Sequence, residues 1–247
     1  MMALSVCCMP DALTAAHSHT CRDSCGTQQA GFAAYSASPP TWPERFHVTF
    51  QEYTHDLVPW HNGSYNKGSF HYDHKQTRQL WSHGDGQTNN WCQCAGLQTS
   101  ALCNLHSLER NGTGGMFAVF PTLNHCCMIG DFAHGFGPIR PDWLVRTNAT
   151  FGGNQTVGGR NCPMWRSHHP GDWFMMKSDD WSQDDDGVPC VYEDHFRDVP
   201  HALGMKHTLT FDSTTYSTEA EADSIFDIPV GILCDKTCPN KEKWCQA

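Results

Sequence analysis

Apolar and polar residues alternate with a period of two along much of the chain, as in strands that bury one face. Phe46, Val48 and Phe50 alternate with polar residues in this way and predict a first strand. The same alternation, or a short apolar run, predicts strands over residues 69–74, 76–82, 90–94, 115–121, 172–177, 188–192 and 208–212. Their spacing of roughly 8 to 15 residues is typical of a mainly β protein.

The segments between these strands carry turn residues or lack a clear period. Gly84-Asp85-Gly86 predicts a hairpin turn, and residues 107–114 predict the loop before the apolar strand at 115–121. Residues 158–170 have no period and are expected to be irregular, and residues 178–187 are expected to form an acidic loop. Residues 218–226 predict one or two helical turns, so helices should be few and short.

The stretch from Cys126 to Gly153 differs from the rest of the chain. It begins with two adjacent cysteines and continues through the Gly135-Phe-Gly-Pro138 turn and Pro141. Proline fixes φ and glycine reaches positive φ, so the pattern predicts a rigid, non-repetitive crossing rather than a helix. Cys126 and Cys127 are expected to anchor two other parts of the chain at one point.

Residues 1–41 form a separate N-terminal segment. Met2, Leu4, Val6 and Cys8 share one face of a period-2 pattern, which predicts a short strand that ends at Pro10. The segment holds too few bulky apolar residues to fold alone. We therefore expect an extended arm over 1–41 and one β domain over 42–247. Residues 1–16 have no basic start and a broken apolar run, so they are a poor match to a signal peptide.

Several short motifs occur in a fixed order along the chain. An aromatic-Pro strand start is followed by G-x-x-x-Y-D, a cysteine pair, G-x-G-P-x-x-P-D-W and a late D-x-x-F-x-x-P-x-x-x-x-C. In this chain they are Trp42-Pro43, Gly68 to Asp73, Cys126-Cys127, Gly135 to Trp143, and Asp223 to Cys234. This order resembles that of secreted ependymin-related proteins of protists and algae.

The resemblance covers roughly residues 42–238 and implies a curved antiparallel sheet, or half-barrel, closed by short helical segments. That shape is shared with lipoprotein-carrier folds. The family often has a third cysteine just after the pair, whereas this chain has Met128, Ile129 and Gly130 there. One bridge of the family is therefore not expected here.

Charge and composition exclude several classes of partner. Only 17% of the 247 residues are charged, and the formal net charge is −10. A protein that binds nucleic acid, or an anionic membrane surface, needs a basic patch, and the sequence has none. No apolar segment approaches the ~18 residues of a membrane helix. The abundant aromatic residues favour a packed fold.

The chain has fourteen cysteines, an even number at irregular spacings, which favours disulfides in an oxidising compartment. Zinc is the alternative, at Cys21-x3-Cys25 and Cys234-x3-Cys238, although the spacing common in zinc knuckles is absent. Most cysteines are expected to be bridged, and Cys126 and Cys127 should take different partners from among Cys92, Cys94 and Cys103. The complete set is Cys7, Cys8, Cys21, Cys25, Cys92, Cys94, Cys103, Cys126, Cys127, Cys162, Cys190, Cys234, Cys238 and Cys245.

Four N-glycosylation sequons begin at Asn62, Asn111, Asn148 and Asn154, all in glycine-rich or polar surroundings. We expect these side chains to be exposed and at least two of them to carry glycan. Together with the cysteines they predict a secreted, extracellular protein.

The sequence offers weak candidates for other chemistry. The aspartates within residues 179–186 suggest calcium, but their spacing is not that of an EF-hand, and a solvated loop is the simpler interpretation. Histidine pairs such as His168-His169 lack a third ligand at a recognisable spacing. G-x-S-x-G is absent. We therefore predict no metal site, no cofactor and no catalytic residues, and expect a protein that is not an enzyme.

Two functions from different classes fit these observations. The first is a structural subunit that self-associates head-to-tail, its arm docking through Met2, Leu4, Val6 and Cys8 on the next copy to build a fibre. The second is an extracellular carrier that holds an apolar ligand in the concave face of the sheet, as the resemblance implies. Whether apolar side chains fill that concavity cannot be decided from sequence.

Overall fold

Eleven antiparallel strands form one open sheet in the computed structural model, which describes residues 38–55, 63–110, 112–168, 176–196 and 206–239. All described residues belong to one compact unit. The fold is mainly β with a few short helices, as the hydrophobic pattern predicts. The strands are β1 (Arg45–His55), β2 (Ser64–Asp73), β3 (Arg78–His83), β4 (Cys103–Arg110), β5 (Thr113–Phe120), β6 (His125–Asp131), β7 (Thr150–Val157), β8 (Arg160–His168), β9 (Met176–Gln183), β10 (Pro189–Phe196) and β11 (Lys206–Ser217).

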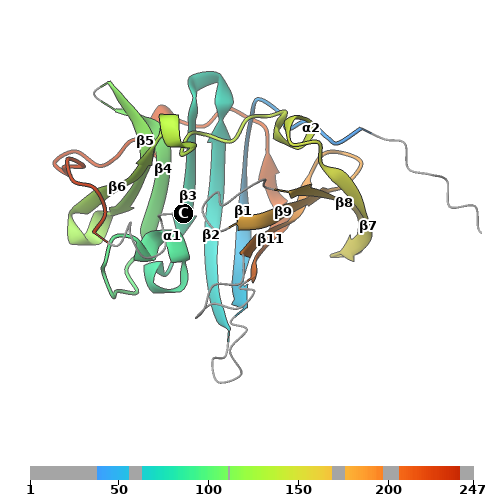
Figure 1. Cartoon of the computed structure of the whole chain (residues 1–247), viewed down its shortest axis with the longest axis horizontal. Coiled ribbons are helices and arrows are strands. Elements are labelled where there is room, and N and C mark those ends of the chain that lie inside the picture. The colour runs from blue at the N-terminus through green and yellow to red at the C-terminus, as the bar shows by residue number, and fades with distance from the viewer. Residues whose placement is uncertain (1–37, 56–62, 111, 169–175, 197–205, 240–247) are drawn as a thin grey trace, which may run out of the picture. The chain divides into compact units, whose positions relative to one another are not determined.

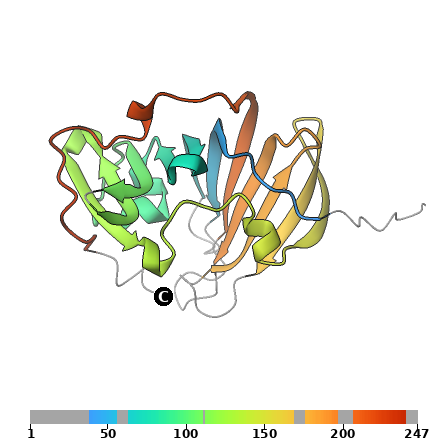
Figure 2. The same ribbon diagram turned by 90° about the horizontal axis from the view of Figure 1, so that it is seen from above.

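The order across the sheet is β6-β5-β4-β3-β2-β1-β11-β10-β9-β8-β7. Strands that are consecutive in the chain are neighbours in the sheet except β6 and β7, so the sheet consists of two meanders that meet where β11 pairs with β1. The chain leaves β6 at one edge and enters β7 at the opposite edge. Figures 1 and 2 show the segment between them crossing the inner face of the curved sheet.

The α-helices of the described residues are single turns that lie in connections between strands. α1 (Asn90–Gln93) lies between β3 and β4, and α2 (Trp143–Arg146) lies in the crossing segment. The 3-10 turns are η1 (His74–Gln76), η2 (Gly86–Thr88), η3 (Pro121–Leu123), η4 (Phe132–His134) and η6 (Asp223–Ile225). The last of these agrees with the helical turn predicted within 218–226.

The inner face of the central strands carries an aromatic core. Alternate residues of β1 are buried, and the register places Val48 beside Phe70 of β2 and Phe50 beside Phe211 of β11. Trp42, which is 3% exposed, packs against the rings of this face. The main cluster of buried residues comprises Trp42, Phe46, Val48, Phe50, Phe70, Tyr72, Leu144, Ala149, Trp165, Trp181, Leu209 and Phe211.

The crossing segment between β6 and β7 is fastened to the inner face by hydrogen bonds. The Tyr72 hydroxyl donates to the Ile139 carbonyl at 2.7 Å, and the Ile139 amide donates to the Gln79 side chain at 2.9 Å. The Trp42 amide donates to the Pro141 carbonyl at 3.0 Å. A non-helical crossing is confirmed for most of the predicted stretch, although its two ends belong to β6 and β7 and residues 143–146 form α2.

Adjacent cysteines at the end of the sheet hold the C-terminal part of the described chain. Successive residues of a strand point to opposite faces, so Cys126 and Cys127 of β6 reach out on different sides. Cys126 bonds to Cys234, and Cys127 bonds to Cys238. Residues 236–238 lie beside β6, where the Met128 amide donates to the Lys236 carbonyl at 2.8 Å. The tail therefore covers the edge of β6, which would otherwise be unpaired.

The two different partners of Cys126 and Cys127 are confirmed, but the expected partners are wrong. Cys103 bonds to Cys92 within the connection that contains α1, and Cys162 bonds to Cys190 in the other meander. Cys94 also takes part in a disulfide. The error came from assuming that the nearest cysteines along the chain are the nearest in space.

Two predicted elements between β3 and β5 are wrong. Residues 90–93 form α1 and Cys94 caps it, so no strand is present there; the Asn89 side chain accepts the Cys92 amide and caps the helical turn. The predicted turn at 84–86 starts this longer connection. Residues 107–110 belong to β4 rather than to a loop, and Arg110 pairs directly with Thr113. The intervening Asn-Gly dipeptide is a strong signal for a two-residue hairpin turn.

Two further predictions fail in the second meander. Residues 160–168 form β8 rather than irregular chain, and Gly158 and Gly159, both at positive φ, make the two-residue turn from β7. Residues 178–183 belong to β9 rather than to an acidic loop. Asp180 is buried there because Arg166 of the neighbouring β8 neutralises it, which the local sequence does not reveal.

Several predictions lie outside the described residues. These are the N-terminal arm through residue 37 with Met2, Leu4, Val6 and its four cysteines, the sequons at Asn62 and Asn111, residues 172–175 of one predicted strand, and Cys245. Self-association through the arm and the boundary at 41/42 remain predictions.

Candidate ligand cavity

A cavity of about 350 Å³ lies between the inner face of the sheet and the crossing segment. The roof comes from Gly135–Arg140 and from Trp143, Arg146 and Thr147. The wall comes mainly from β3, β4, β5 and β10. The apolar lining side chains are Trp81, Trp91, Leu105, Met116, Phe136, Ile139, Trp143 and Tyr192.

Strand register explains how these residues meet. Trp81 of β3 lies opposite Leu105 of β4, and both point to the inner face. Phe136 reaches the sheet because β6 has a glycine beneath it. A Cβ atom on Gly130 would lie 2.0 Å from a Phe136 ring carbon, so a larger residue would displace the roof. Aromatic side chains therefore surround the cavity from both the sheet and the crossing.

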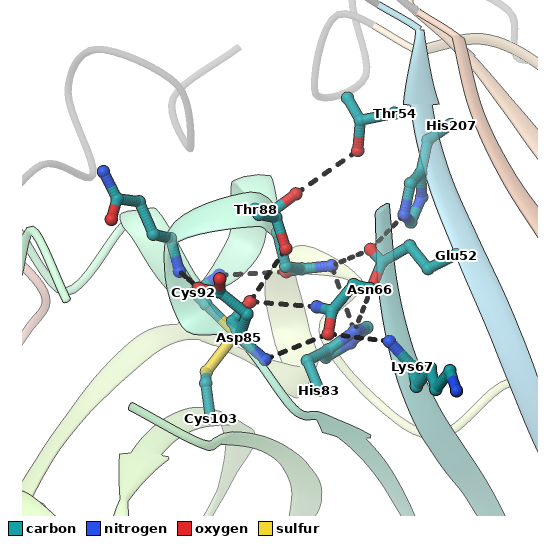
Figure 3. A network of polar contacts seen from close by, with 12 residues as sticks. Glu52, Thr54, Asn66, Lys67, His83, Asp85, Thr88, Cys92, Cys103 and His207 are labelled. Carbon is teal, nitrogen blue, oxygen red and sulfur yellow. Dashed lines mark hydrogen bonds and ion pairs between the residues drawn. A yellow bond between two sulfur atoms is a disulfide. The ribbon is translucent and has the colours of Figure 1, made fainter. Parts of the chain in front are cut away.

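At one end of the cavity, the lining residues His83, Asn89, Asp194 and His207 join a buried polar network around Glu52, which lies behind the lining. Glu52, His83 and His207 are 1%, 2% and 6% exposed. His83 Nδ1 donates to Glu52 Oε2 at 2.8 Å, and His207 Nε2 donates to Glu52 Oε1. His207 Nδ1 donates to Asp194 Oδ2 at 3.1 Å, and Asn89 Nδ2 donates to Glu52 Oε1 at 2.8 Å. Figure 3 shows Glu52 between the two histidines.

The ionisation of this network follows from its contacts. Burial alone would raise the pKa of Glu52, but the charges and hydrogen bonds of His83 and His207 outweigh it and hold that pKa well below its usual range. Burial alone would lower the pKa of His207, but Asp194 and Glu52 outweigh it and raise that pKa to about 10. His207 is therefore an imidazolium at neutral pH.

The loop from 84 to 95 supports the polar end (Figure 3). The Asn66 side chain donates to the Asp85 carbonyl at 2.9 Å and accepts the Asp85 amide at 3.0 Å. The Cys92–Cys103 disulfide ties α1 to β4. These contacts fix Asn89, whose side chain caps α1 and also reaches Glu52.

His207 should make stability depend on pH. Its folded pKa of about 10 exceeds an unfolded pKa of ~6.5, so its stabilising effect is complete below pH 6.5 and is lost as pH rises toward 10. In that window the free energy of unfolding should fall by up to ~1.4 kcal/mol per pH unit from this group alone. His195, whose pKa is raised to about 9, adds a slope of the same sign.

The measurement is urea denaturation at pH 6, 7, 8 and 9. His207→Gln should reduce the fall in stability with rising pH, while His134→Gln, at an exposed position, should leave the wild-type slope intact. Equal slopes in the His207→Gln and wild-type proteins would contradict the assignment.

A second cluster lies on the outer face across β8 to β11. Asp180, Glu193 and His195 place a possible ligand atom each within 4.8 Å of one another. Arg166 makes a bidentate pair with Asp180 at 2.7 and 2.5 Å, and Lys206 Nζ lies 2.6 Å from Glu193. Burial would raise the pKa of Asp180, but Arg166 and His195 lower it to about 2. The alternation of charges indicates a cross-strand ladder of ion pairs.

A third cluster, also on the outer face, joins a serine, a histidine and a carboxylate. His71 Nε2 lies 2.8 Å from Ser69 Oγ, and His71 Nδ1 lies 2.8 Å from Glu221. The order resembles that of a hydrolytic triad. Ser69, however, lies inside β2, which pairs on both sides with β1 and β3. Its neighbouring amides are used by the sheet, so they do not form an oxyanion hole.

The residues predicted from sequence and the cavity residues are different sets. Asn148 and Asn154 are exposed, as expected for glycosylation sites. The disulfides indicate an oxidising, extracytoplasmic compartment. In the turn after β9, Asp184 accepts the Val188 amide at 2.9 Å and pairs with Arg160 at 2.9 Å, so this part of the acidic segment stabilises a hairpin.

Sequence reasoning missed the polar end of the cavity, although one signal was present. Glu52 continues the alternation of Phe46, Val48 and Phe50, so it occupies a position on the buried face of β1. A carboxylate at such a position requires partners. Its partner His207 lies 155 residues later, and no local pattern connects the two.

Comparisons with known proteins give a fold likeness only. No family model and no curated protein matches the chain. An uncharacterised conserved protein from Thermus thermophilus superimposes with a TM-score of 0.44 at 6% identity, covering 78% of this chain and 90% of that one. A DUF1329 family protein from Desulfovibrio piger superimposes with a TM-score of 0.35 at 8% identity, covering 74% of this chain and 90% of that one. A LolA superfamily protein from Nitrosomonas europaea superimposes with a TM-score of 0.31 at 6% identity, covering 76% of this chain and 92% of that one.

The single open antiparallel sheet expected from the motifs is found, whereas the likeness to lipoprotein carriers and membership of the ependymin-related family remain predictions. In the part of the chain that the structure describes, no helix is long and apolar enough to cross a membrane.

Proposed function

We propose that this protein is a secreted, ependymin-like carrier that binds a small apolar ligand in the cavity beneath the crossing segment. The observation that carries the proposal is the cavity itself. It has about 350 Å³ of space, a mostly apolar lining that includes five aromatic side chains, and buried polar groups at one end. Small-molecule sites commonly have this size and composition.

The surrounding structure supports a cavity that stays open. The crossing is hydrogen-bonded to Tyr72, Gln79 and Trp42, so the roof has a fixed position over the sheet. Disulfides on both sides of the sheet stiffen the frame. The exposed sequons at Asn148 and Asn154 favour the secretory route, where a carrier of apolar molecules would meet its ligand in water.

Dodecanol tests this proposal, because it is apolar and carries no charge. Three tryptophans line the cavity, so binding should change the intrinsic fluorescence in a saturable way with one site per chain. Leu105→Trp should fill the cavity and weaken binding by about tenfold or more, since the added ring occupies the ligand's space.

Leu123→Trp is the matched control, because Leu123 in η3 is 47% exposed and is not among the residues that line the cavity. It should bind dodecanol like the wild type. Absence of saturable binding to the wild type, or equal binding by Leu105→Trp, would refute the carrier proposal.

A further inference from the structure

One buried carboxylate at the polar end of the cavity has an oxygen for which the described residues supply no well-placed donor. Asp194 is 3% exposed, lines the cavity, and uses Oδ2 to accept from His207. Its Oδ1 receives no hydrogen bond from the described residues. A buried acceptor without a donor is destabilising, and more so when it is charged. The site therefore suits a ligand group that donates a hydrogen bond.

The neighbours of Asp194 favour a positively charged donor. Asp179, also a cavity residue, lies opposite Asp194 in the β9–β10 pair. The Tyr192 hydroxyl interacts with both carboxyl groups, but its single proton cannot satisfy all of their oxygens. Burial together with these charges raises the pKa of Tyr192 well above its usual value, so Tyr192 stays neutral. The His207 imidazolium is already paired with Glu52 and Asp194, so an anionic ligand group placed here would still face two carboxylates.

The aromatic wall is compatible with such a charge. The Trp81 and Tyr192 rings stack with centroids 6.2 Å apart, and both border the cavity. Cations are attracted to the faces of such rings within about 6 Å of the centroid. An ammonium group beside Asp194 would therefore meet carboxylate and aromatic partners together.

The two arginines at the roof are poor partners for an anionic ligand group. Arg140 and Arg146 are the arginines that border the cavity, and their side chains are 57% and 58% exposed. Both already face Asp142, at 3.1 and 4.0 Å. Exposed and already paired charges contribute little to binding.

From this geometry we infer that the cavity selects a protonated apolar amine. Its ammonium group donates to Asp194 beside Asp179, and its apolar part lies against Trp81, Phe136 and Trp143. The inference rests on the proposed carrier function and adds the chemical class of the ligand.

Three ligands with the same chain separate the head groups: dodecylammonium, dodecanol and dodecanoate, titrated at pH 7 below their micelle concentrations. Dodecylammonium should bind about tenfold tighter than dodecanol, the gain expected from one charge-assisted hydrogen bond. Dodecanoate should bind more weakly than dodecanol.

Asp194→Asn should lower the affinity for dodecylammonium by about tenfold and leave that for dodecanol nearly unchanged. Asp227→Asn, at an exposed position on the outer face, is the matched control and should change neither affinity. If Asp194→Asn does not fold, the order of affinities of the wild-type protein for the three ligands still tests the preference for an amine.

The outcomes distinguish the two proposals. Saturable dodecanol binding with no preference for the amine, or with dodecanoate binding tightest, overturns the amine inference and leaves the carrier function standing. If dodecanoate binds tightest and Arg146→Gln weakens it, the ligand enters with its head group at the roof. Failure of all three ligands to bind overturns both proposals.

Discussion

Removing both disulfides of the adjacent cysteines should destabilise the protein far more than the two single removals combined. Cys126–Cys234 and Cys127–Cys238 span 108 and 111 residues and close nearly the same loop. While one bridge remains, the other closes only a small additional loop of about five residues, worth ~2 kcal/mol by loop entropy. Without either bridge, the loop of about 110 residues opens as well, and the total loss reaches ~7 kcal/mol.

A loss of that size approaches the whole stability of an ordinary domain. The measurement is urea denaturation of Cys126→Ala/Cys234→Ala, Cys127→Ala/Cys238→Ala and the quadruple variant. Removal of the Cys162–Cys190 disulfide, which spans 28 residues in the other meander, should lower the free energy of unfolding by ~3.5 kcal/mol. This loss should add to the loss from removing either edge disulfide. Simple additivity of the two edge pairs would show that the bridges do not share one loop.

Glu52→Gln should lower the free energy of unfolding by about 3 kcal/mol at pH 7, the lower end of the cost of breaking a buried ion pair. The substitution keeps the shape of the side chain but removes the charge between His83 and His207. The His207 imidazolium then retains only Asp194 as a carboxylate partner, in a position that is only 6% exposed. The change should be seen in urea denaturation with unchanged far-UV circular dichroism.

A double-mutant cycle tests the cause. Glu52→Gln/His207→Gln should cost less than the sum of its single variants by at least ~1 kcal/mol, because the second change removes the charge that the first one stranded. Glu109→Gln, at an exposed position of β4, is the matched control and should change stability by less than about 0.5 kcal/mol. A cost of Glu52→Gln equal to that of the control would mean that the network does not stabilise the fold.

Strands could be predicted where the alternation of apolar and polar residues was strong. The prediction failed where other residues hid that alternation. The alternation in β1 and the apolar run in β5 gave those strands directly. β8 was missed because Pro163 and the preceding glycines hide its alternation. The predicted strand over 172–177 reaches only the start of β9, and the rest of β9 was missed because Asp179 and Asp180 look solvated until their neighbours in β8 and β10 are known.

The sequence by itself determined the β class, the crossing after the cysteine pair, and the separate bonding of Cys126 and Cys127. These properties depend on residues close together in the chain, through side-chain period, proline and glycine conformation, and the strain of a bond between adjacent cysteines. Only the tertiary structure decided which cysteines meet, that Glu52, Asp194 and His207 share one buried network, and that a cavity remains beneath the crossing. A period of two specifies which face a side chain occupies, but not which strand lies beside it. Those partners depend on strand order and register, which long-range pairing sets across the whole sheet.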